Sequence, residues 1–230
     1  MCNHPRRGGV VGSVCTECPT ALAADVMTAF PMLVAHHRDL VYGVARRSSS
    51  AREDAEDLTQ ETFIRAYRAL MGYPPERRGD LRIRGWLARI TLNLARNRAR
   101  GRRPATADLA AIAEPLDDRD PGPERLAERR ESGQRWRRLL ATLPRSQRLA
   151  VELRHVEGLS YPEIAEALAK PIGTVKSDVH RGIERLRRAY EADEAREADP
   201  GPRRSANGSP AGRAIERLEN GMIEGKVMAR

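Results

Sequence analysis

The chain has 230 residues, of which only 4% are aromatic, and this combination favours two small helical domains over a large β-sandwich core. Its formal net charge of +9 favours a polyanionic partner, although any arginine-rich composition produces the same balance. No apolar stretch approaches the length of a membrane span and the N-terminus lacks a signal-peptide pattern, so we expect a cytoplasmic protein without direct membrane insertion.

All three cysteines, Cys2, Cys15 and Cys18, lie close to the N-terminus, near His4. These four side chains are of the types that bind zinc, and Cys15 and Cys18 have the CxxC spacing. A single CxxC without a second such pair is a weak signal, however. We therefore interpret residues 1–27 as a flexible leader with reduced thiols, and we expect neither a metal nor a cofactor.

A helix is predicted from Thr28, because a capping residue is followed by Pro31 in the first turn. Its apolar positions fall together on a helical wheel and predict a face directed to the core: Phe30, Leu33, Val34, His37, Val41 and Val44. His36 and His37 are adjacent and point apart on a helix, so we interpret them as packed or solvated side chains rather than a ligand pair.

The segment 51–73 begins with acidic residues, which suit the N-terminal end of a helix dipole. A buried row is predicted from its apolar spacing: Leu58, Thr62, Phe63, Ala66 and Leu70. The same spacing leaves Asp57, Gln60 and Glu61 facing outward. Taken alone, these polar residues need do no more than solvate the helix.

The segment 83–103 predicts a strongly amphipathic helix. Its apolar side comprises Ile83, Trp86, Leu87, Ile90 and Leu94, and its opposite side comprises Arg89, Asn93, Arg96, Arg100 and Arg103. A row of arginines repels itself unless an anion neutralises it, and nucleic-acid phosphate is the obvious candidate. Trp86 could stack on a base, but its place on the apolar side favours the core.

Residues 104–133 have no sustained apolar stripe and read as a flexible linker. Two further helices are predicted over 134–143 and 145–156, separated by Pro144. Residues 191–230 read as a C-terminal extension of unknown role, with one short helix ending near Gly221 and a solvated tail as the default interpretation.

Residues 158–188 predict a helix-turn-helix. Ser160 and Glu163 form a capping box that starts one helix at Tyr161, and Pro171 and Gly173 then break the chain. Thr174 is the expected cap of a second helix with a buried stripe of Val175, Val179, Ile183 and Leu186. The free face carries Lys176, Ser177, His180 and Arg181. A polar stripe is usually only a solvated face, but the cap, the turn and the basic residues together favour insertion into a DNA major groove.

The sequence LPRSQRLAVELRHVEGLSYPEIAEAL, followed by PIGTVKSDVHRGIERLR, closely resembles the promoter-binding fourth region of bacterial sigma factors of the extracytoplasmic-function group. DLTQETFIRAYRAL resembles the second region of the same family. The resemblance covers residues 30–101 and 134–190 and implies an all-α protein. Two small helical domains, at 28–103 and 134–190, are expected to be joined by the flexible linker.

The resemblance also implies roles for the exposed residues. Asp57, Gln60 and Glu61 would contact the clamp helices of core RNA polymerase. Contacts to the melted minus-ten strand are expected from Arg84, Arg89, Asn93, Arg96, Asn97 and Arg100, and contacts to the minus-thirty-five duplex from Thr174, Lys176, Ser177, His180 and Arg181. The expected partners are core polymerase, promoter DNA and an anti-sigma factor, and polymerase performs the chemistry.

The chain departs from the family pattern at two places. Asp178 stands where the family carries arginine, so a phosphate contact is either missing or replaced by a salt bridge to Arg181 or Arg185. Ala169 stands in the turn where the family commonly has glycine, and a positive φ there would cost about 1 kcal/mol.

Two other functions are compatible with parts of the sequence. A stand-alone helix-turn-helix repressor or activator fits residues 158–188 equally well but leaves residues 51–103 unexplained. An enzyme would need clustered acid, base or nucleophile signals, and the only candidates are Cys15 and Cys18.

Overall fold

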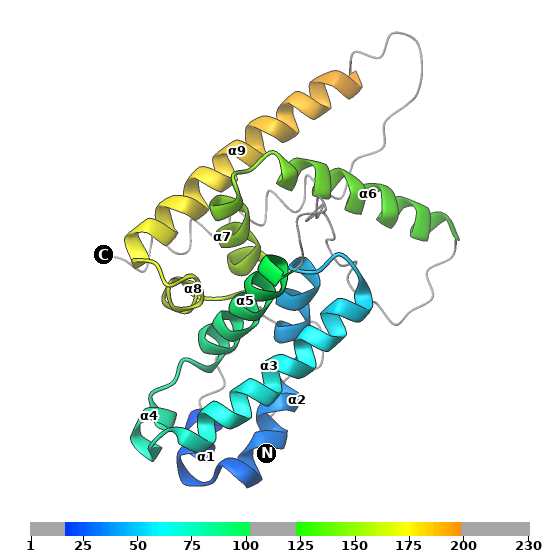
Figure 1. The fold of residues 1–230 in the computed structure, drawn as a ribbon. Coiled ribbons are helices and arrows are strands. Elements are labelled where there is room, and N and C mark those ends of the chain that lie inside the picture. Colours follow the sequence, from blue (N-terminus) through cyan, green and yellow to red (C-terminus); the bar gives the residue numbers. More distant parts are fainter. Residues whose placement is uncertain (1–16, 102–122, 199–230) are drawn as a thin grey trace. The chain divides into compact units, whose positions relative to one another are not determined.

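A computed structural model describes residues 17–101 and 123–198, and in these residues all regular structure is helical. The helices are α1 (Glu17–Ala24), α2 (Val26–Arg47), α3 (Arg52–Gly72), α4 (Pro75–Gly79), α5 (Ile83–Gly101), α6 (Pro123–Ala141), α7 (Arg145–His155), α8 (Tyr161–Leu168) and α9 (Ile172–Ala198) (Figure 1). The all-α prediction is confirmed. The short helix expected near Gly221 lies outside the described residues.

The described residues form two compact units, and their division does not follow the predicted linker. The first unit holds α1 to α5 together with residues 152–176, and the second holds α6, α7 as far as Val151, and α9 from Ser177. Residues 152–176 join the first unit because α8 packs against α5. Gly85 permits this approach, since a Cβ on it would lie 2.6 Å from the Glu163 carbonyl oxygen.

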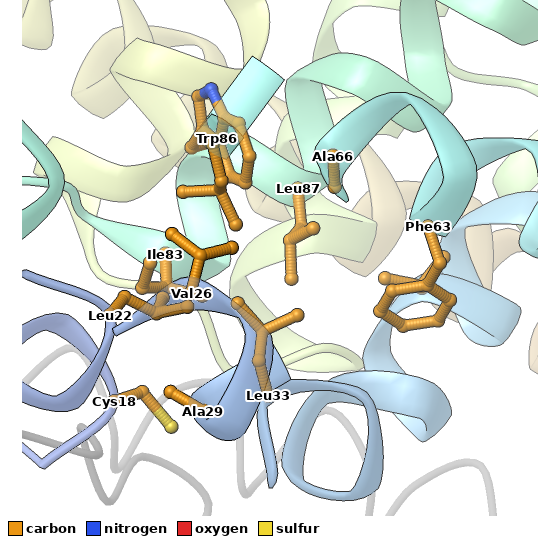
Figure 2. Close-up of a cluster of buried hydrophobic side chains, with 12 residues drawn as sticks. Cys18, Leu22, Val26, Ala29, Leu33, Phe63, Ala66, Ile83, Trp86 and Leu87 are labelled. Carbon is orange, nitrogen blue, oxygen red and sulfur yellow. The ribbon is translucent and has the colours of Figure 1, made fainter. Parts of the chain in front are cut away.

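The core of the first unit joins α1, α2, α3 and α5 through apolar side chains (Figure 2). Trp86 is only 7% exposed, so the prediction that it belongs to the core is confirmed. Leu33, Leu70 and Leu87 are completely buried beside it. Helices α3 and α5 are therefore packed into the core on one side, and their other sides face outward.

The first unit begins earlier in the chain than the sequence predicted. Residues 17–24 form α1, and Cys18 and Leu22 are completely buried in the core rather than part of a flexible leader. Asp25, not Thr28, caps α2, because its carboxylate accepts hydrogen bonds from the Met27 and Thr28 amides at 3.0 and 3.2 Å. Local pattern did not reveal α1, whose burial depends on contacts with α2 and α4.

The second unit contains α6, the first part of α7 and most of α9. Arg135 of α6 donates to the Asp193 carboxylate at 2.8 Å and lies over the Tyr190 ring at 4.8 Å. Helix α6 begins at Pro123, eleven residues before the predicted Gln134, so the predicted linker is shortened from its C-terminal side.

The helix-turn-helix is formed by α8 and α9. Ser160 and Glu163 make the predicted capping box, and Tyr161 is the first residue of α8. Ala169 has φ of 51°, as its place in the turn required, and this left-handed conformation is strained for a residue with a Cβ. The predicted cap at Thr174 is wrong because α9 begins at Ile172, which places Thr174 inside its first turn.

Candidate protein and nucleic-acid interfaces

The acidic face of α3, defined as Asp57, Gln60 and Glu61, is presented to solvent. Asp57 and Gln60 are exposed and Glu61 is half-buried. Glu61 accepts a hydrogen bond from Arg65 at 2.7 Å, and this bond is the main reason that the pKa of Glu61 lies below its usual value. Glu61 is therefore ionised at neutral pH, which keeps this face negatively charged at its centre.

An apolar patch adjoins the acidic face and was not singled out by the sequence. Ile64 is 45% exposed and borders a shallow groove lined by Phe30, Phe63, Tyr67 and Arg68. The rings of Phe30 and Tyr67 meet edge to face at 5.0 Å and hold one wall of the groove. An apolar patch rimmed by polar residues is typical of a protein contact surface. The sequence contained a signal for this patch, because the helical spacing of Ile64 from Asp57 and Gln60 places it on the same side of α3.

The basic face of α5, defined as Arg89, Asn93, Arg96, Asn97 and Arg100, is exposed along its whole length. Arg96 donates to the Asn93 side-chain oxygen at 2.8 Å. Because Leu87 and Leu94 bury the opposite side of the helix, the arginines cannot turn inward. The predicted separation of apolar and basic sides is confirmed for the residues that the structure describes, and Arg103 lies outside them.

Arg84 differs from the other predicted strand contacts. It donates to the backbone carbonyls of Glu157 and Gly158 at 2.6 and 3.0 Å, and its side chain is only 14% exposed. Glu157 also pairs with Arg47, yet burial raises its pKa above the usual value and the nearby arginines only partly offset this. Arg84 is thus occupied by protein groups in this arrangement, and the sequence could not foresee a partner 73 residues away.

The recognition face of α9, defined as Thr174, Lys176, Ser177, His180 and Arg181, is exposed at all five positions. The opposite stripe of Val175, Val179, Ile183 and Leu186 is buried, as its spacing predicted. Lys176 and Arg181 carry the positive charge of this face. A helix that is anchored on one side and basic on the other has the form required to enter a DNA groove.

Two contacts orient the basic residues of α9. The Lys176 ammonium lies 5.8 Å from the centre of the Tyr161 ring. Asp178 is 6% exposed, and its carboxylate lies 3.6 Å from the Arg181 guanidinium. Of the two salt bridges left open by the sequence, the one to Arg181 is therefore present. Asp178 therefore contacts a neighbouring arginine that belongs to the recognition face.

The described residues contain no group of three or more metal-ligating side chains close enough to hold an ion. Within the same residues, every helix is too short or too polar to cross a membrane.

Two family models match the chain in the expected order. The sigma-70 region 2 model matches residues 33–104, which include the faces of α3 and α5. The sigma-70 region 4 model matches residues 133–186, which include the recognition face of α9.

Curated relatives agree with these matches. The chain is 41% identical over 164 residues to the ECF RNA polymerase sigma factor SigE of Mycolicibacterium smegmatis, covering 70% of this chain and 61% of that protein. It thus spans less than two thirds of that relative. It is also 36% identical to the RNA polymerase sigma-H factor of Pseudomonas aeruginosa, covering 71% of this chain and 86% of that protein.

Solved structures show the same fold. CnrH, in complex with the cytosolic domain of CnrY, is similar with a TM-score of 0.56 and 26% identity, covering 79% of this chain and 99% of CnrH. RpoE of Bartonella quintana, in complex with the anti-sigma factor NepR, has a TM-score of 0.51 and 24% identity, covering 71% and 98%. With two regions, their order and these relatives in agreement, the chain belongs to the sigma-70 family of RNA polymerase sigma factors, in its extracytoplasmic-function group.

Proposed function

We propose that this protein is a cytoplasmic transcription initiation factor that binds core RNA polymerase and directs it to specific promoters. The observation that carries the proposal is the presence in one chain of an acidic, partly apolar face on α3 and basic faces on α5 and α9. The first fits a protein partner and the other two fit nucleic acid. The protein acts by binding, and polymerase performs the chemistry.

Each face has a distinct role in this proposal. The acidic face of α3 docks on polymerase, and its apolar neighbour Ile64 is buried in the contact. The basic face of α5 holds the unpaired minus-ten strand. The recognition face of α9 reads the minus-thirty-five duplex. Arg84 is left out of the strand contact, because its guanidinium already donates to two carbonyls.

We also infer an anti-sigma factor as a partner. Its support is the similarity to RpoE, whose structure is a complex with the anti-sigma factor NepR. The apolar groove beside Ile64 offers a surface that an inhibitor and polymerase would compete for.

Footprinting with and without core polymerase tests the proposed function. Two modules that read separate promoter elements must be held at a fixed spacing. We expect core polymerase to fix that spacing and to offset the entropy cost of ordering the two modules. Alone, the protein should bind DNA weakly and with strong salt dependence. With core enzyme it should protect both elements and expose unpaired bases of the non-template strand to a single-strand reagent.

A stand-alone repressor would behave differently in the same experiment. It would give a tight, sequence-specific footprint by itself, and core enzyme would neither change that footprint nor produce unpaired bases. That result would overturn the proposed function. Core enzyme without the protein is the necessary blank, since it reveals any background melting.

Replacing the two cations of the recognition face should weaken promoter binding in different ways. Arg181→Ala should reduce discrimination between promoters by about 1–3 kcal/mol if it contacts a base, because a lost bidentate contact costs that much. Lys176→Ala should weaken binding to all sequences and lower the slope of log K against log salt by about 1 if it contacts a phosphate. Titrations of the polymerase complex at several salt concentrations measure both.

Arg138→Ala, on the exposed side of α6, is the matched control because it removes the same charge outside the recognition face. It should leave promoter selectivity and the salt slope nearly unchanged. If both recognition-face variants bind promoters like the parent protein, α9 does not read DNA.

A further inference from the structure

Helix α8 and the loop before it are held against α2 and α5 by polar contacts that the proposed function does not use. Arg84 of α5 donates to the carbonyls of Glu157 and Gly158 at 2.6 and 3.0 Å. Arg47 of α2 pairs with the Glu157 carboxylate, and both of these side chains are only 10% exposed. Glu163 of α8 brings a second carboxylate to 3.9 Å from Arg84. All of these residues lie in the first unit, and together they form what we call the α5–α8 contact.

The backbones of α5 and α8 approach closely at this contact. Gly85 of α5 is buried, and a Cβ on it would lie 2.6 Å from the carbonyl oxygen and 2.9 Å from the Cα of Glu163. Any larger residue at position 85 therefore requires α8 to move. Because the paired charges are also mostly buried, removing one partner leaves the other charge buried without compensation. The α5–α8 contact is thus a specific docking of α8 rather than a loose encounter.

Docking of α8 also brings negative charge to the basic face of α5. Glu166 of α8 is half-buried, and burial raises its pKa, although the nearby positive charges of Arg82 and Arg89 oppose this rise. Arg89 is the first residue of the basic face, and it remains exposed. A carboxylate near Arg89 competes with a strand phosphate for the same guanidinium. Docking of α8 and binding of a DNA strand therefore oppose each other at this end of α5.

The docked position of α8 also limits the distance between the two DNA-binding faces. Helix α8 has eight residues, and α9 begins at Ile172, four residues after α8 ends. The reach of these residues keeps Lys176 within about 45 Å of Arg89. The minus-ten and minus-thirty-five elements are about 25 base pairs apart, which is about 85 Å of B-form duplex. While α8 is docked, the chain cannot place Arg89 on one element and Lys176 on the other.

We propose that the α5–α8 contact is autoinhibitory and holds the free protein in a closed arrangement that cannot engage both promoter elements. Helix α8 must leave α5 before the promoter is bound. Core polymerase favours this step because it binds the open arrangement, with the two modules apart, more tightly than the closed one. The consequence for promoters rests on the proposed function, whereas the contact and its effect on strand binding are measured on the free protein.

Gly85→Ala tests the proposal because its methyl group meets the Glu163 backbone while every charge is retained. Alanine favours a helix more than glycine does, so α5 itself is not weakened. The full-length free protein is titrated with a fluorescent single strand of oligo-dT. If about 10% or less of the parent protein is open, its apparent affinity is at least about tenfold below that of the open form. Gly85→Ala should therefore bind the strand roughly tenfold more tightly than the parent.

Gly133→Ala is the matched control. Gly133 lies within α6, where a Cβ meets no atom within 4 Å, so this variant has the same gain in helix propensity without a clash. Its affinity for oligo-dT should equal that of the parent protein. Amides of α8 should exchange hydrogen faster in Gly85→Ala than in Gly133→Ala, because the docked helix has been released.

Arg47→Gln tests the same contact by a change with the opposite effect on charge. The loss of a positive charge by itself weakens binding to DNA, but this variant leaves the buried Glu157 carboxylate without its ion-pair partner. Affinity for oligo-dT should therefore rise, by roughly fivefold. Arg38→Gln removes an exposed charge from the same helix and should not raise the affinity. Circular dichroism verifies that the helices of each variant are intact.

Two results would overturn the proposal. One is equal strand affinity of Gly85→Ala and Gly133→Ala, and the other is an affinity that falls alike in Arg47→Gln and Arg38→Gln. Footprints with core polymerase are measured on the parent protein, so the two hypotheses fail separately. A polymerase-dependent footprint without any effect of Gly85→Ala keeps the proposed function and removes the autoinhibition. Tighter strand binding by Gly85→Ala without such a footprint keeps the α5–α8 contact and removes the proposed function.

Discussion

Binding to core RNA polymerase is expected to be lost when Asp57 and Glu61 are both changed to lysine. Both residues lie on the acidic face of α3, whose opposite side is anchored in the core. A reversed charge turns an attraction into a repulsion, and disrupting a closely paired interface charge costs roughly 2–5 kcal/mol. Each 1.4 kcal/mol corresponds to about tenfold in affinity, so the double variant should fall below detection in a pull-down with core enzyme.

The fold should survive this change because exposed charges contribute little to stability. Glu61 loses its pair with Arg65, which is an i,i+4 contact worth about 0.2–0.5 kcal/mol. Circular dichroism and a thermal melt verify that the helices remain. A variant that unfolds would show that the two carboxylates are structural.

The double variant Glu56→Lys with Glu76→Lys is the matched control. Both glutamates are exposed, and replacing them makes the same change in net charge outside the acidic face. Glu56 lies on α3 itself, about 100° around the helix from Asp57. If this control loses polymerase binding to the same extent, total charge rather than the acidic face is responsible.

Gly182→Leu is expected to destroy minus-thirty-five recognition while core-polymerase binding persists. Gly182 of α9 is buried, and a Cβ there would lie 2.6 Å from Val151 Cγ2 of α7. Valine is branched at Cβ and cannot swing aside easily, so α9 must shift away from α7. Overpacking of this kind costs about 1–3 kcal/mol, and more when backbone has to move.

Gly173→Leu isolates the steric effect. Gly173 lies near the start of the same helix, and a Cβ there meets no atom within 4 Å. Leucine improves helix propensity at both positions, so only Gly182→Leu should lower the free energy of unfolding in denaturant titrations. Equal stability of the two variants would mean that α7 and α9 do not approach as closely as the structure indicates.

The sequence by itself determined the helices whose apolar residues recur with a helical period. The stripe of Val175, Val179, Ile183 and Leu186, and the separation of apolar and basic sides on α5, could be predicted because the period of a helix fixes which residues share a face. The capping box at Ser160 and the strained turn at Ala169 were also predictable, because both depend on neighbours in the chain. For the same reason, the outward positions of the candidate interface residues followed from their spacing.

Only the tertiary structure decided the features that depend on contacts distant in sequence. It placed Cys18 in the core beside His36 and engaged Arg84 with the carbonyls of Glu157 and Gly158. Residues 17–24 carry too short an apolar pattern to predict a packed helix, and α2 and α4 provide the surface that buries it. Local periodicity predicts which face of a helix is buried. Which helix buries that face, and which polar side chains bond across the contact, is decided only when the helices pack.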